Sequence, residues 1–97
     1  MPVSVINVEI HLPGARSLKD KRKIVKSLKD RIHSRFRMSV AETGFHELHQ
    51  RSEIGIAAVA PDGAHLSQLT ERVRRLFDER FDITVTRWDE RIVGREG

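Results

Sequence analysis

The sequence of 97 residues contains no cysteine and no tyrosine, and aromatic residues make up only 5% of it. The lack of cysteine excludes disulfide bonds, thiolate catalysis and cysteine-based zinc sites. Thermolabile amides are scarce as well, with one asparagine and two glutamines. Together with the arginine-rich charge, this scarcity favours a thermophilic source.

Long apolar runs are also missing. The longest one covers residues 54–61, far short of the roughly 20 residues that a membrane span needs. The first basic residue is Arg16, so residues 1–12 lack the charged start of a signal peptide. We therefore expect a cytoplasmic protein without a membrane partner, folded as a single domain over residues 1–97.

Hydrophobic periodicity predicts six elements. Apolar residues at helical spacing indicate helices over about 18–36 and 64–80. Alternating or continuous apolar residues indicate strands over 3–12, 37–43, 53–60 and 82–88, with a polar loop over 44–52, a turn at 61–63 and a frayed tail after Gly94. The order β-α-β-β-α-β is that of an α+β, ferredoxin-like domain. It predicts two helices on one face of a four-stranded antiparallel sheet of order 4-1-3-2, with the opposite face uncovered.

Positive charge is concentrated in the first predicted helix. Residues 18–37 contain nine basic and two acidic side chains, a net charge of +7, whereas the whole chain carries only +4. On a helical wheel, five of these cations share an arc beside the apolar face, and we call them the basic stripe: Lys19, Arg22, Lys23, Lys26 and Lys29. This arrangement predicts a surface that contacts nucleic-acid phosphates. A solvated helix face that keeps the protein soluble is the simpler alternative.

The turn before this helix supplies Gly14, Arg16 and Ser17. Free backbone N–H groups at a helix N terminus favour anions, so these three residues are candidates for anion binding. The spacing of a P-loop is missing, which favours a plain turn capped by Ser17.

The sequence gives little support for a metal site or a catalytic site. His46 and His49 have His-x-x-His spacing, with Glu42 and Glu47 nearby. In a loop this spacing has no fixed geometry, and a third ligand would have to come from elsewhere. We therefore predict no metal, no cofactor and no catalytic residues.

The single tryptophan indicates association. Strand alternation places Trp88 with Thr84 and Thr86 on the uncovered face of the predicted sheet, near Ala57. A second subunit that covers this ring predicts a homodimer with Ala57, Thr84, Thr86 and Trp88 at the contact. Base stacking on Trp88 and dimerisation through the edge strands are the alternatives.

Several short motifs resemble the YlxP-like family of small bacterial domains of unknown function. They are Ser17-Leu18-Lys19-Asp20-Lys21-Arg22, Val25-Lys26-Ser27-Leu28, Ser39-Val40-Ala41-Glu42, and Gln50-Arg51 before Gly55-Ile56-Ala57. The resemblance covers nearly the whole chain and implies a ferredoxin-like fold. It also implies an RNA or ribosome context by association, because genes of the family often neighbour those for translation initiation and ribosome-maturation factors. His49 departs from the tryptophan that relatives often carry.

Three hypotheses follow. The leading one is a non-enzymatic module that binds ribosomal RNA or the ribosome through the basic stripe. The second is a structural or regulatory homodimer that binds a protein partner and no nucleic acid. The third is small-anion or phosphoryl chemistry at Gly14, Arg16 and Ser17.

Overall fold

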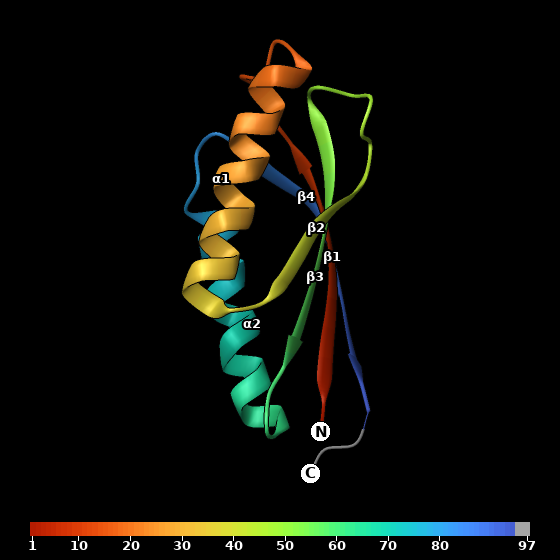
Figure 1. Cartoon of the computed structure of the whole chain (residues 1–97), viewed down its shortest axis with the longest axis vertical. Helices are drawn as coiled ribbons and strands as arrows, with labels where there is room; N and C mark the ends of the chain where they lie inside the picture. The colour runs from red at the N-terminus through yellow and green to blue at the C-terminus, as the bar shows by residue number, and fades with distance from the viewer. Residues whose placement is uncertain (95–97) are drawn as a thin grey trace.

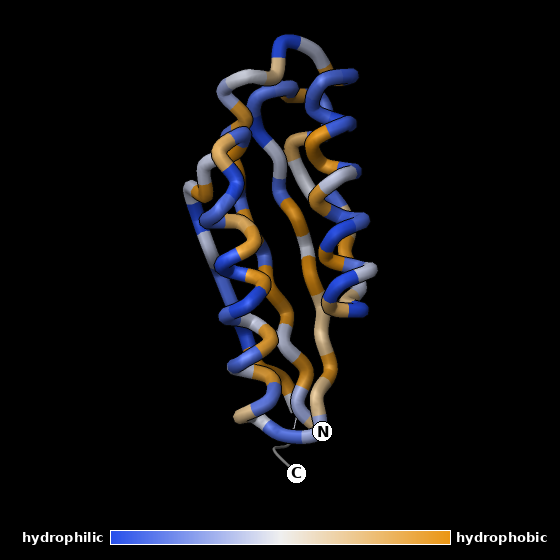
Figure 2. The backbone as a smooth tube through the Cα atoms, turned by 90° about the vertical axis from the view of Figure 1, so that its left-hand side faces the viewer, coloured by the Kyte–Doolittle hydropathy of each residue, from blue (hydrophilic) through white to orange (hydrophobic). Residues whose placement is uncertain are grey.

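The computed structural model describes residues 1–94 as one sheet with two helices (Figure 1). In chain order the elements are β1 (Val3–His11), α1 (Leu18–Phe36), β2 (Ser39–Gly44), β3 (Arg51–Val59), α2 (Gly63–Asp78) and β4 (Thr84–Val93). The strands are antiparallel in the order β2-β3-β1-β4, which is the predicted order read from the other edge. Both helices lie on one side of the sheet, so the predicted α+β, ferredoxin-like fold is confirmed (Figures 1 and 2).

The core lies between this helix layer and the sheet. Alternate residues of β1 point into it, and Ile6 and Val8 are completely buried. The helices contribute the residues that recur at helical spacing, among them Leu28 and Ile32 of α1 and Val73 of α2, each with no exposed surface. The apolar periodicity of the sequence therefore identifies the buried face of each element.

Both helices begin at a capping residue. The side chain of Ser17 accepts a hydrogen bond from the Asp20 N–H at 3.1 Å, and Asp62 accepts one from the His65 N–H at 2.9 Å. These bonds satisfy N–H groups that have no partner within the helix. Neither helix among the described residues is long and apolar enough to cross a membrane.

The strand boundaries differ from the sequence prediction, most of them by one or two residues. β2 begins at Ser39 because Arg37 ends α1 in the left-handed conformation, with φ 55°. β3 begins at Arg51, which pairs with His11 of β1, and the next residue, Ser52, is fully buried opposite Ile10. β4 continues to Val93, pairing with the start of β1 at Val3. Its polar second half hides this extension from hydrophobic periodicity, and the frayed tail predicted after Gly94 lies outside the described residues.

The placement of Trp88 on the uncovered face is wrong. The register between β1 and β4 shifts beside Glu9: Ile10 lies opposite Val85, whereas Glu9 lies opposite Arg87. Thr86 is the extra residue of this β-bulge, and an extra residue reverses the side-chain alternation that follows. Trp88 therefore lies opposite Val8 on the helix-covered face and packs against the core.

Candidate nucleic-acid interface

The basic stripe lies on the side of α1 that borders β2. Lys19, Arg22, Lys23 and Lys26 are exposed, and Lys29 is half-buried. A shallow groove of about 420 Å³ runs beside the stripe, lined by Lys29, Asp30, His33, Ser39 and Val40. The five predicted cations therefore share one face of the helix, next to the open edge of the sheet.

Only one cation of the stripe forms a salt bridge within residues 1–94. Lys26 Nζ lies 2.7 Å from Asp30 Oδ2, one helical turn away and open to solvent. The hydrogen bond to Asp30 raises the pKa of Lys26, and the same bond lowers the pKa of Asp30. Lys19, Arg22, Lys23 and Lys29 have no ion pair among the described residues. Four of the five cations are thus free to contact an external anion.

Lys21 lies in the same basic run, but its side chain is only 2% exposed. Its ammonium group lies 3.0 Å from Glu42 Oε2 and 2.8 Å from the Phe45 carbonyl oxygen. It also donates to the carbonyl oxygens of His46 and Arg51. Lys21 therefore joins α1 to the β2–β3 connection and takes no part in the external charge.

The sequence contains a signal for this role that charge counting misses. At 100° per residue, Lys21 falls between Leu28 and Ile32, in the middle of the apolar arc of α1. A lysine at such a position has to be buried or bent away from the core. Buried lysines require partners for their charge, which Glu42 and the loop carbonyl groups provide.

The same contacts lower the pKa of Glu42. Burial acts to raise the pKa of Glu42, but hydrogen bonds from Ser52 and Lys21 outweigh burial and lower the pKa below its ordinary value. The Ser52 hydroxyl donates to Glu42 Oε2 at 2.6 Å. The carboxylate is thus held in its charged form opposite Lys21.

The turn that contains Gly14, Arg16 and Ser17 is held by hydrogen bonds to Asp20. The Arg16 N–H donates to Asp20 Oδ2 at 2.9 Å, while the Ser17 hydroxyl accepts from the Asp20 N–H. This reciprocal arrangement is close to a capping box, and it brings the Asp20 carboxylate to the end of the helix where an anion would bind. Anion binding by these three residues stays a prediction, which this geometry does not favour.

His46 and His49 do not form part of a metal-ligand cluster. Among the described residues, no three His, Asp or Glu side chains come together in a way that could hold a metal ion. His46 Nε2 instead lies 3.3 Å from the carbonyl oxygen of Glu42 in β2.

The structure separates the four residues predicted at the dimer contact. Ala57 lies on the uncovered face, paired with Val5 of β1 and Ser39 of β2. Thr84 lies opposite His11 on this face, and the hydroxyl of Thr86 donates to the Glu9 carbonyl oxygen at 3.1 Å. Trp88 is on the other side, where its ring meets Phe77 edge-on at 5.6 Å.

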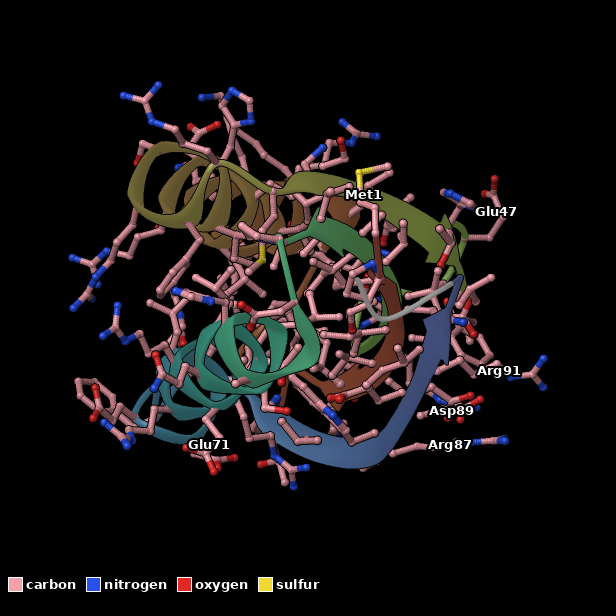
Figure 3. The ribbon with its side chains drawn as sticks, turned by 90° about the horizontal axis from the view of Figure 1, so that it is seen from below. Met1, Glu47, Glu71, Arg87, Asp89 and Arg91 are labelled. Carbon is pink, nitrogen blue, oxygen red and sulfur yellow. The ribbon has the colours of Figure 1, made fainter. Side chains whose placement is uncertain are left out.

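Charged side chains occupy part of the uncovered face. Figure 3 shows Arg87, Asp89 and Arg91 projecting from β4 on the side away from the helices. Further along this face, Arg51 Nη2 lies 3.7 Å from Glu9 Oε2. Charges of both signs alternate here, which contrasts with the single sign of the basic stripe.

Comparison with known proteins places this fold in a family. Residues 3–90 match the model of a family described as "Protein of unknown function (DUF503)". The chain belongs to the DUF503 family. This DUF503 protein is also 35% identical over 75 residues to "Uncharacterized protein YlxP" of Bacillus subtilis (strain 168), which covers 75% of this chain and 82% of the relative.

Membership confirms the resemblance to YlxP-like proteins that the sequence motifs indicate. The matched residues of the DUF503 protein extend from β1 into β4 and include the whole basic stripe. The descriptions of the family and of the relative assign no activity. The function therefore has to be argued from the surface chemistry of the chain itself.

Proposed function

We propose that this DUF503 protein is a non-enzymatic module that binds ribosomal RNA or the ribosome, with phosphate contacts from the basic stripe. The carrying observation is that four of its five cations form no salt bridge within residues 1–94. Like charges one turn apart, such as Lys19 and Lys23, destabilise a helix by a few tenths of a kcal/mol per pair. Phosphates bound along the stripe would remove that repulsion.

The position of the stripe supports contact with an extended backbone. Lys19 and Lys29 are ten residues apart, which corresponds to about 15 Å along an α-helix. Successive phosphates of single-stranded RNA can follow such a row, with the groove at His33 and Ser39 continuing the path along β2. Contacts of this kind carry affinity and little sequence specificity.

Charge reversal tests the proposal. We expect the triple variant Lys19→Glu, Lys23→Glu, Lys26→Glu to keep its helical circular dichroism and to lose affinity for bacterial ribosomal RNA by about 100-fold or more. The matched control, Arg31→Glu, Arg87→Glu, Arg91→Glu, makes the same change in net charge at exposed positions outside the stripe. Equal losses of RNA affinity in both variants would show that net charge, and not the basic stripe, causes the loss. Unchanged affinity in the folded triple variant would refute the proposal.

A homodimer that uses the uncovered sheet face, without nucleic acid, is the second proposal. The observation that favours it is a shallow apolar depression of about 330 Å³ on this face, lined by small residues such as Gly55 and Ala57. Val5 is part of its lining, and both Val5 and Val59 are exposed. Sedimentation equilibrium tests the proposal with Ala57→Arg: a wild-type dimer that the substitution converts to monomer supports it, and a monomeric wild-type protein contradicts it.

A further inference from the structure

A second concentration of positive charge lies apart from the basic stripe. Four arginines, Arg35, Arg37, Arg72 and Arg75, line a cavity of about 450 Å³ between the C-terminal end of α1 and α2. Glu79 is the single carboxylate in the lining, so the side chains there carry a net charge of +3. None of the four arginines forms an ion pair within the described residues.

Helix electrostatics account for only part of this cluster. Basic side chains are favourable in the last turn of a helix, which explains Arg35 in α1 and Arg75 in α2. Arg72 lies a turn earlier, and it adds a third charge to the same cavity. The partial negative charge at the end of α1 amounts to about half a charge. Most of the positive charge of the arginines therefore remains for an anion to neutralise.

Arg37 occupies a backbone conformation that favours glycine. Its φ of 55° and ψ of 38° are left-handed, and its N–H donates to the His33 carbonyl oxygen to cap the helix. Glycine is the usual residue at such a position because a Cβ atom costs about 1 kcal/mol there. The Arg37 side chain that this helix end presents lines the cavity.

The cavity also has an apolar floor. Phe36, Leu69 and Leu76 form it, and the guanidinium of Arg35 lies 5.6 Å from the centroid of the Phe36 ring. Arginine binds phosphate oxygens through paired N–H groups, while aromatic and apolar side chains accept the flat face of a base. The volume falls in the range of about 300–1,000 Å³ that small-ligand pockets have.

We propose that this cavity binds a nucleoside diphosphate or triphosphate, with the phosphates between the arginines and the base against the apolar floor. Inorganic phosphates would use only the arginine rim, and an uncharged nucleoside only the floor. A ligand that carries both groups uses the whole lining. The site is separate from the basic stripe, so it does not depend on RNA binding.

Titration calorimetry with ATP, GTP, inorganic tripolyphosphate and adenosine tests the proposal. We expect saturable binding of at least one nucleotide, at least tenfold tighter than tripolyphosphate, and no detectable binding of adenosine. The absence of saturable nucleotide binding up to millimolar concentration would overturn the proposal. Tripolyphosphate that binds as tightly as both nucleotides would overturn it as well, because the base would then contribute nothing.

Substitutions test whether the nucleotide binds in this cavity. We expect Arg72→Gln with Arg75→Gln to weaken nucleotide binding by about 100-fold, at roughly tenfold per charged hydrogen-bond donor. The matched control, Arg22→Gln with Lys23→Gln on the basic stripe, should leave nucleotide binding unchanged while it weakens RNA binding. Equal loss in both double variants would contradict the assignment to this cavity.

Arg37→Gly separates binding from stability. Relief of the left-handed strain should raise the melting temperature, while removal of the guanidinium should weaken nucleotide binding about tenfold. A purely structural arginine would give the opposite result, with a lower melting temperature and unchanged binding, and that result would overturn the role of Arg37.

Discussion

Lys21 of α1 and Glu42 of β2 form a salt bridge of 3.0 Å with side-chain exposures of only 2% and 19%. The pair connects the first turn of the helix to an edge strand, at the end of the molecule where the β2–β3 connection also lies (Figure 1). Lys21 donates in addition to backbone carbonyl groups of that connection, including Phe45. This buried contact separates one lysine of the basic run from the cations that remain outside.

Substitution of Lys21 should destabilise the protein strongly. We expect Lys21→Met to lower the free energy of unfolding by about 2–4 kcal/mol, because it removes the only cation paired with the Glu42 carboxylate among the described residues and the donor of the loop carbonyl groups. Urea denaturation measures the loss. Lys23→Met, two residues away and exposed, is the matched control and should change stability by less than about 0.5 kcal/mol. Equal effects of the two substitutions would contradict the structural role of Lys21.

Stability should depend on pH through Glu42. Its pKa is lowered in the folded protein, so its contribution is present above the ordinary value of 4.5 and is lost as the pH falls through the folded pKa. We expect Glu42→Gln to cost about 1–3 kcal/mol at pH 7. The gap between variant and wild type should close as the pH falls below 4.5 and through the lowered pKa of Glu42. Urea titrations at several pH values measure it, and a constant gap would show that the charge of Glu42 is not the cause.

The tryptophan should behave as a packed residue. Trp88 is half-buried, with Phe77 at its edge and the Arg74 guanidinium 4.7 Å from its ring centroid. We expect a blue-shifted fluorescence emission that external quenchers reach poorly, and a loss of about 2–3 kcal/mol of stability in Trp88→Ala. The control is Phe81→Ala, because Phe81 is 100% exposed. A red-shifted, freely quenched emission would contradict the register that places Trp88 opposite Val8.

Hydrophobic periodicity predicts most of this fold because each helix and each of the inner strands buries one regular face. It predicts α1 over the residues that the structure assigns to it, and it identifies Ile6 and Val8 as core residues. It fails where a single residue changes the geometry. The bulge at Thr86 inserts one residue into β4, and this reverses the face on which Trp88 lies.

The candidate site was predictable to the extent that it depends on one element. The wheel of α1 correctly groups the basic stripe, because all five side chains belong to the same helix. It also contains the signal for the burial of Lys21, whose position in the apolar arc outweighs its charge. The arginine cavity could not be predicted in this way, since Arg35 and Arg72 come together only when α1 and α2 pack side by side.

The salt dependence of RNA binding tests the central claim most directly. If the five cations of the basic stripe each contact a phosphate, the logarithm of the affinity for single-stranded ribosomal RNA should fall with the logarithm of salt concentration with a slope of about −3.5. The variant Lys19→Glu, Lys23→Glu, Lys26→Glu should lose about 2 units of that slope, at roughly 0.7 per contact. A slope near zero for the wild-type protein, or an equal slope for the folded variant, would contradict the claim that the basic stripe binds RNA.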